Sequence, residues 1–150
     1  MINTKKIFIS IICILFFKTT YAEEFSLKWS ITVTVLEEIV LIGGGNYRVN
    51  KAEGSWEDTK GYYGFLKCIG PIIIDGKKNL NLNLICDGYD NNNDKFQINL
   101  KRNSIEDAGI GKAIYIHGTG RYLDFINKEC TYAVNYLNPK VGFYKQICKD

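Results

Sequence analysis

The chain has 150 residues, a length that predicts one folded domain. Its 19 Lys and Arg outnumber its 16 Asp and Glu, but three of the lysines lie in the first 22 residues, which contain no acidic residue. Residues 23–150 therefore carry 16 basic and 16 acidic side chains and have a formal net charge of zero. Without a basic field, this part of the chain is not expected to bind nucleic acid or an anionic membrane surface.

The first 22 residues have the pattern of a secretory signal peptide. Two lysines precede an apolar run at 7–17, and Ala22 ends a small-x-small cleavage site. We expect cleavage after Ala22, which leaves residues 23–150 as an exported domain without a stable membrane anchor, in the periplasm or outside the cell. The composition, rich in Ile, Lys and Asn, is typical of a bacterial protein. A lipoprotein signal at Cys13 and a retained anchor are the alternatives.

Alternating apolar and polar residues predict β-strands along most of residues 23–150. The pattern is strongest at 25–35, 80–84 and 96–100, where every second residue is apolar. Turn-forming residues separate the strands, and no segment has a convincing helical pattern. The number of strands predicts an all-β fold, either a single closed antiparallel barrel of about eight strands or a β-sandwich. Weaker strands are expected at 39–42, 46–52, 61–69, 112–117, 131–137 and 141–147.

Four cysteines in residues 23–150 predict two disulfide bonds. An even number of cysteines is typical of disulfides in an exported chain, and neither a Cys-x-x-Cys pair nor a second histidine supports a zinc site. Residues equidistant from a hairpin turn face each other across the two strands. We therefore expect the pairs Cys68–Cys86 and Cys130–Cys148, each separated by 18 residues with a predicted turn at the midpoint.

The segment HGTGRYLDF at 117–125 has two glycines that invite comparison with a phosphate-binding loop. A P-loop needs G-x-x-x-x-G-K-[ST], and the nearest match, EDAGIGKA at 106–113, lacks the first glycine and the hydroxyl residue. A dinucleotide-binding GxGxxG is also absent, because Leu123 occupies the position of the third glycine. We therefore interpret Gly118 and Gly120 as a structural turn between two strands, AIYIH and RYLDF.

His117 is the single histidine of the chain. In the predicted strand it shares a face with Tyr115, whereas Ile114 and Ile116 are expected to face the interior. Because no nucleophile or acidic partner accompanies it in the sequence, we interpret it as a surface residue and not as a general base. No catalytic residue is predicted.

The glycine segment also resembles part of the allene oxide cyclase and dirigent barrels and of their bacterial exported relatives of unknown function. Residues 118–122, GTGRY, match the last five positions of the Gly-Gly-Thr-Gly-(Arg/Lys)-(Phe/Tyr) segment of those proteins, and the resemblance covers roughly residues 105–137. It implies an eight-stranded antiparallel barrel in which this segment is a strand, a turn and a second strand. The sequence departs from the family at Asn127–Glu129, where a second glycine is usual. Because the motif is structural, it implies a fold and transfers no catalytic residue.

Residues 90–95, DNNNDK, contain part of a calcium-loop pattern. Asp90, Asn92 and Asp94 stand where ligands one, three and five of an EF-hand loop would stand, but lysines replace the required glycine and glutamate. We interpret the segment as a polar hairpin loop, with weak calcium binding as the alternative. No other cofactor is expected.

Aromatic residues concentrate around GYYGF at 61–65. Tyr47, Trp56, Tyr62, Tyr63 and Phe65 are candidates for the lining of an apolar ligand pocket at the mouth of a barrel. The alternative is that they pack in the core, which is the usual location of aromatic residues on strands.

Three functions are open on the sequence alone. The leading hypothesis is a non-enzymatic binding protein for a small apolar ligand or a partner protein, because the expected interior positions are apolar. A cyclase- or isomerase-type enzyme acting on a conjugated small molecule would need ionisable groups inside the barrel. An inhibitory or structural module would act through a protruding loop. The segment 87–94 is the candidate, because it is the one long loop that the sequence predicts. The identity of the ligand and the oligomeric state are not indicated.

Overall fold

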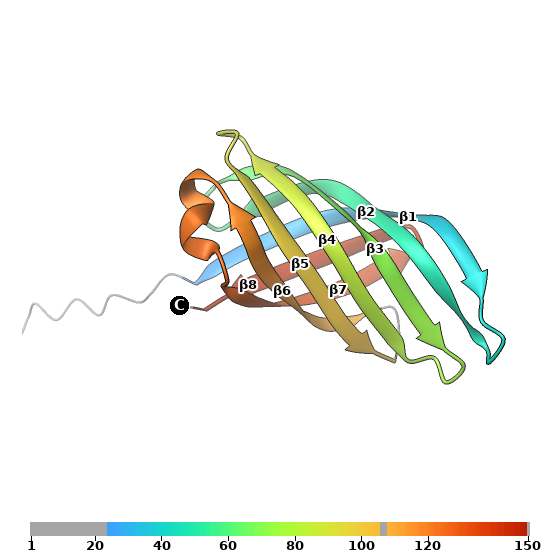
Figure 1. Ribbon diagram of the computed structural model, residues 1–150. Helices are drawn as coiled ribbons and strands as arrows, with labels where there is room; N and C mark the ends of the chain where they lie inside the picture. The colour runs from blue at the N-terminus through green and yellow to red at the C-terminus, as the bar shows by residue number, and fades with distance from the viewer. Residues whose placement is uncertain (1–23, 106–107, 150) are drawn as a thin grey trace, which may run out of the picture.

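Eight antiparallel strands form a closed barrel in the computed structural model, which describes residues 24–105 and 108–149 (Figure 1). Each strand pairs with the next along the chain, and the eighth pairs with the first. The prediction of a single all-β barrel is confirmed, and the sandwich alternative is wrong. The predicted signal peptide, residues 1–22, lies outside the described residues. The strands are β1 (Phe25–Val40), β2 (Gly45–Asp58), β3 (Tyr63–Asp75), β4 (Leu80–Asp90), β5 (Lys95–Ser104), β6 (Gly109–Gly118), β7 (Glu129–Asn138) and β8 (Val141–Cys148).

The first strand is the longest and forms one side of the seam that closes the barrel. It continues to Val40 through a β-bulge between Val35 and Glu37, so the separate strand predicted at 39–42 is the end of β1. Along the seam, β1 pairs with β8 from Phe25, opposite Cys148, onward. Every described strand therefore has a neighbour on both sides, although β1 beyond Val33 extends past β8 and pairs with β2 alone.

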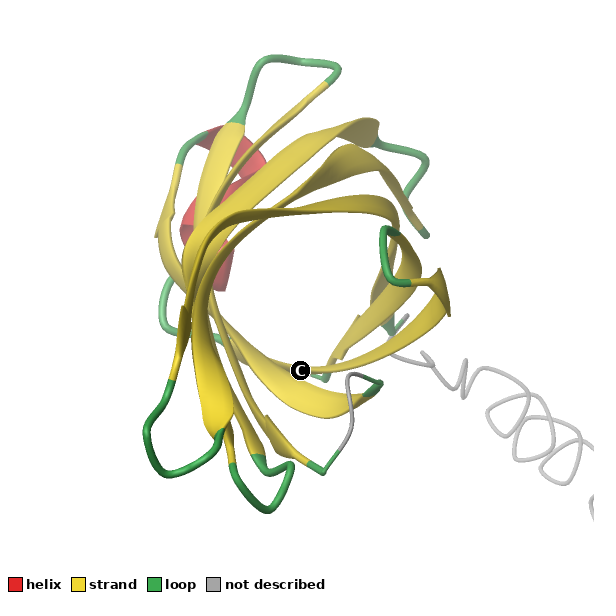
Figure 2. Cartoon of the chain, turned by 90° about the vertical axis from the view of Figure 1, so that its right-hand side faces the viewer, coloured by secondary structure: helices red, strands yellow, loops and turns green. Residues whose placement is uncertain are grey.

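Side chains fill the barrel. Alternate residues of each strand point inward and form one core of aliphatic, aromatic and cysteine side chains. Figure 2 looks into the ring of strands. The hollow that Trp29, Leu84 and Tyr144 help to line inside the barrel measures about 30 Å³, close to the volume of one water molecule. Glycines make room for the rings, since a Cβ atom on Gly111 would lie 2.4 Å from Cζ of Tyr132. The interior is thus a packed core.

Both predicted disulfides are confirmed. Cys68–Cys86 links β3 to β4 and Cys130–Cys148 links β7 to β8, with Cα atoms 3.9 and 4.3 Å apart. All four cysteines are buried in the core. Two disulfides in one small barrel fit an extracytoplasmic compartment, because thiols in the cytosol are kept reduced.

The segment predicted to be a strand after the two glycines is instead a 3-10 helix, η2 (Gly120–Phe125). β6 ends at Gly118, and Gly120 adopts a φ of 49°, a conformation that favours glycine and turns the chain into the helix. Tyr122 is fully buried, with its ring centre 4.6 Å from that of Phe96. The helix thereby packs on one end of the barrel, the end near the C-terminus in Figure 1. Among residues 24–105 and 108–149, no helix is long and apolar enough to cross a membrane.

Candidate functional site

The five aromatic residues considered as one pocket lie in separate environments. Trp56 points into the core, whereas Tyr63 and Phe65 lie on the outer face of β3 and are 61% and 36% exposed. Tyr62 lies against an arginine of η2, whose guanidinium carbon is 3.6 Å from the ring centre. Tyr47 lies near the start of β2, whereas Trp56 lies near the end of the same strand. The structure therefore does not bring the five residues together.

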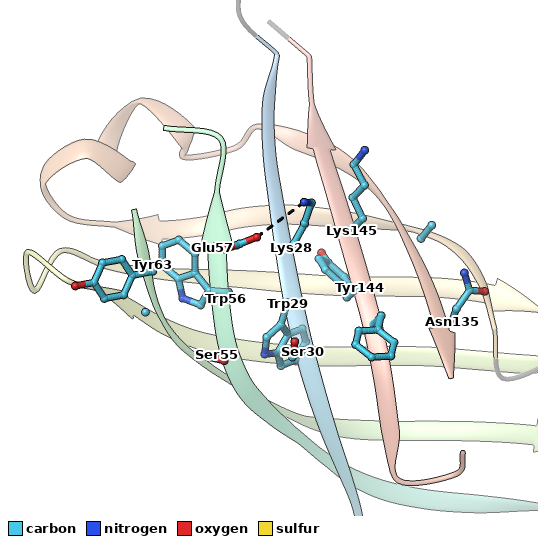
Figure 3. A pocket seen from close by; sticks show the side chains of 13 residues that line it. Lys28, Trp29, Ser30, Ser55, Trp56, Glu57, Tyr63, Asn135, Tyr144 and Lys145 are labelled. Carbon is cyan, nitrogen blue, oxygen red and sulfur yellow. Dashed lines mark ion pairs between the residues drawn. The ribbon is translucent and has the colours of Figure 1, made fainter. Parts of the chain in front are cut away.

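A groove of about 740 Å³ crosses the outer wall of the barrel over β8, β1 and β2 (Figure 3). The small outward residues Ser30 and Ser55 lie between two large ones, Tyr63 and Phe143, which are 61% and 55% exposed. Of the five predicted aromatic residues, Trp56 and Tyr63 take part in its lining. The lining residues are Lys28, Trp29, Ser30, Ser55, Trp56, Glu57, Tyr63, Gly64, Ala133, Asn135, Phe143, Tyr144 and Lys145.

A second hollow of about 470 Å³ continues this groove toward β6, and the two hollows share Ala133 and Lys145. We call their combined lining the outer groove. It contains lysines and glutamates, including the exposed ion pair Lys28–Glu57, with 3.9 Å between Nζ and Oε1. It also contains Ile110, which is 69% exposed. The second hollow is lined by Glu24, Ile110, Glu129, Thr131, Tyr132, Ala133, Lys145, Ile147 and Lys149.

A buried ion pair joins η2 to the end of β2. The Nη2 atom of Arg121 is 2.8 Å from Oδ2 of Asp58, and the two side chains are 17% and 0% exposed. The other carboxylate oxygen of Asp58 accepts the backbone N–H groups of Lys60 and Tyr62 at 2.8 and 3.0 Å. These contacts neutralise the carboxylate and anchor the helix on the barrel.

The residues of the partial calcium pattern are engaged within the turn between β4 and β5. Oδ1 of Asp90 accepts the backbone N–H groups of Asn92 and Asp94 at 2.8 and 3.0 Å, and its Oδ2 accepts the hydroxyl of Tyr122 at 3.2 Å. Because β4 extends to Asp90, the long loop expected at 87–94 is a short turn. In the part of the chain that the structure describes, no group of three or more His, Cys, Asp or Glu is placed to hold a metal ion. The segment is thus a polar hairpin turn, and weak calcium binding stays an untested alternative.

Strand β6 turns a different face inward from the one predicted. Tyr115 is fully buried, whereas Ile114 and Ile116 are half-buried and His117 is exposed. A tyrosine can occupy the core here because its hydroxyl accepts a hydrogen bond from Nε2 of Gln146 at 2.9 Å. The structure thus places the histidine on the surface.

The interior contains polar groups that sequence reasoning missed. Gln146 is fully buried; it accepts the hydroxyl of Tyr144 at 2.7 Å and donates to that of Tyr115. Arg102 and Asp90 are buried as well. The available signal was period-two alternation, because Gln146 and Arg102 each lie two positions from a core residue and Asp90 lies two positions from the buried Gly88. The expectation of a purely apolar interior was therefore wrong.

Burial raises the pKa of four interior tyrosines above the ordinary value of about 10. It raises the pKa of Tyr132 to about 12, and it also raises the pKa of Tyr115, Tyr122 and Tyr144. Each of these tyrosines has a higher pKa in the folded than in the unfolded protein. Their ionisation therefore leaves the free energy of unfolding unchanged below about pH 10 and lowers it as the pH rises toward 12. We expect the free energy of unfolding in urea to fall by about 1.4 kcal/mol per pH unit for each such tyrosine in this range.

Two variants distinguish this effect from general alkaline damage. Tyr132→Phe removes one buried titrating group and should make the pH dependence shallower, whereas Tyr63→Phe, at a position 61% exposed, should leave it unchanged. Phenolate absorbance from all nine tyrosines of residues 23–150 in the still-folded protein near pH 11 would contradict the prediction.

The fold and its outer groove define a class of protein, a small disulfide-linked β-barrel in which eight strands follow in chain order. A similar barrel occurs in a solved structure described as "the protein with unknown function from Clostridium acetobutylicum ATCC 824". The two align with a TM-score of 0.64 and 15% sequence identity, over 85% of this chain and 98% of that chain. At this identity the likeness shows the fold alone. Neither a protein-family model nor a curated protein matches the chain.

Proposed function

We propose that this is an exported, non-enzymatic binding protein that holds a partner polypeptide in the outer groove. The observation that carries the proposal is the difference in volume between the two sides of the barrel wall. The interior hollow measures about 30 Å³, whereas the larger of the two hollows of the outer groove measures about 740 Å³. Pockets for small molecules usually measure roughly 300–1,000 Å³ and enclose most of the ligand. The packed core leaves no such space, which favours recognition on the outside.

The shape and chemistry of the outer groove suit a polypeptide. It is open and extends over several strands, as a contact with another protein requires. Tyr63 and Phe143 are exposed aromatic residues of the kind that anchor protein interfaces. Lysines and glutamates lie around them, so a partner with both charge signs can be matched. Because β8, β1 and β2 are each paired on both sides where the groove crosses them, side chains and not strand addition would carry the recognition there.

Export is supported by the predicted signal peptide together with the two disulfides. The resemblance to the cyclase and dirigent barrels stays a prediction and adds no catalytic residue. An enzyme of that kind needs room for a substrate beside its ionisable groups. The buried hydroxyls of Tyr115 and Tyr144 are already hydrogen-bonded to Gln146, which favours binding over catalysis.

Site-specific photo-crosslinking tests the proposal in the exported fraction of the native host. A photoreactive amino acid at Ser30, in the outer groove, should give an adduct of discrete polypeptide mass, whereas the same group at Asn83, on the outer face of β4, should not. Native mass spectrometry of the undenatured protein provides an independent reading. A small added mass that is lost on unfolding would overturn a polypeptide partner in favour of a small molecule.

Binding of the partner identified by crosslinking should depend on Phe143. We expect Phe143→Ala to weaken the affinity at least tenfold, because an aromatic anchor is commonly worth about 2 kcal/mol or more at the centre of an interface. Ile85→Ala is the matched control, since Ile85 is 48% exposed on the opposite wall and should have no effect in the same calorimetric titration. Equal losses in the two variants would exclude the outer groove as the binding surface.

A further inference from the structure

Arg102 is a buried cation that has no counter-charge among the residues that the structure describes. It lies on β5 with its side chain inside the barrel and is 4% exposed. Its Nε and Nη1 atoms are buried and have no hydrogen-bond partner, and it takes part in no ion pair within residues 24–105 and 108–149. A buried guanidinium in this state is strongly unfavourable, because it has lost its hydration and gained no opposite charge.

The other buried charges in the described part of the barrel are engaged. Asp58 pairs with Arg121 at 2.8 Å, and Asp90 accepts two backbone N–H groups and the Tyr122 hydroxyl. Arg102 is therefore an exception that needs a partner of its own.

The surroundings of Arg102 show what kind of partner fits. It lines the interior hollow of about 30 Å³ together with aliphatic and aromatic residues, and no carboxylate is part of that lining. Trp29 lines the same hollow, and its indole Nε1–H is also buried without an acceptor. Two side chains with unused hydrogen-bond donors therefore border one small space with no acidic side chain in its wall.

We propose that the barrel binds one monovalent anion of about the size of chloride against Arg102. A guanidinium offers several N–H donors and a permanent positive charge. The hollow has room for a single monatomic ion but not for a sulfate or phosphate with four oxygens. Its aliphatic and aromatic wall favours a weakly hydrated halide over a strongly hydrated anion. The site lies inside the barrel, so it is independent of the outer groove and of the proposed partner.

The test is thermal unfolding of the full domain in sodium chloride against sodium gluconate at equal ionic strength, with gluconate as an anion too large for the hollow. Above the dissociation constant, each tenfold increase in chloride should raise the midpoint by roughly 4 °C, because the ion binds the folded state. Arg102→Met should lose this response. It should also fold and be at least as stable as the wild type in gluconate, because a neutral side chain of similar length removes the unpaired charge.

Lys101→Met is the matched control, because Lys101 is the exposed neighbour of Arg102 on the same strand and its variant should keep the chloride response. Crystals grown in bromide should show one anomalous peak within hydrogen-bonding distance of the Arg102 guanidinium. Equal chloride responses in the wild type and Arg102→Met would overturn the site. Bromide found on the barrel surface alone would overturn it as well.

Discussion

Replacing Arg121 with methionine will lower the free energy of unfolding by about 3 kcal/mol. The substitution removes the guanidinium that lies 2.8 Å from Asp58 and leaves a fully buried carboxylate without its counter-ion. Breaking one side of a buried ion pair typically costs about 3–5 kcal/mol, and the partial exposure of Arg121 places the expectation at the lower end. Urea denaturation at neutral pH measures the loss directly.

The double variant Asp58→Asn with Arg121→Met separates charge from packing. An asparagine keeps an oxygen for the backbone N–H groups of Lys60 and Tyr62 but carries no charge. The double variant should therefore be more stable than Arg121→Met alone by about 1–2 kcal/mol. A loss below about 1 kcal/mol in the single variant would mean that the pair behaves like an exposed one and does not anchor η2.

Removing either disulfide will cost about 3 kcal/mol, the amount that closing a loop of this length contributes by restricting the unfolded chain. Because both bridges are inside the core, alanine replacements also leave small cavities that add to the loss. The variants are Cys68→Ala with Cys86→Ala, and Cys130→Ala with Cys148→Ala. Urea denaturation of each double variant beside the wild type gives the two free-energy differences.

The two disulfides should differ in their local effect. The Cys130–Cys148 bridge holds β8, which also pairs with β1 at the closing seam, so its removal should speed amide hydrogen exchange along both strands. Loss of Cys68–Cys86 should speed exchange mainly in β3 and β4. Unchanged denaturation midpoints in both variants would contradict a stabilising role.

The parts of the fold that could be predicted from the sequence depend on local periodicity. Apolar residues at every second position identify β1 up to its bulge and about half each of β4 and β5. The cysteine pairs follow from symmetry about a turn, which requires only that neighbouring strands form hairpins. A chain whose strands pair in sequence order allows such predictions, because nearly every contact is made with an adjacent element.

The parts that could not be predicted depend on contacts between distant segments. The run RYLDF alternates like a strand. However, Arg121 forms an ion pair with Asp58 and the ring of Tyr122 packs against that of Phe96, and these contacts favour the helix. The inward face of β6 was predicted wrongly because Tyr115 is buried through a hydrogen bond to Gln146. The outer groove combines residues of β1, β2, β3, β6, β7 and β8, so only the register of the closed sheet reveals it.

The closing seam between β1 and β8 has a consequence for how the molecule is made. β1 leaves the ribosome first and β8 leaves it last of the eight strands, and every other pairing joins neighbours in the chain. Hairpins, including the one linked by Cys68–Cys86, can form while the rest of the chain is still being synthesised. Until β8 arrives, β1 and β7 each keep an unpaired edge, so the growing chain is at its most aggregation-prone just before the ring closes.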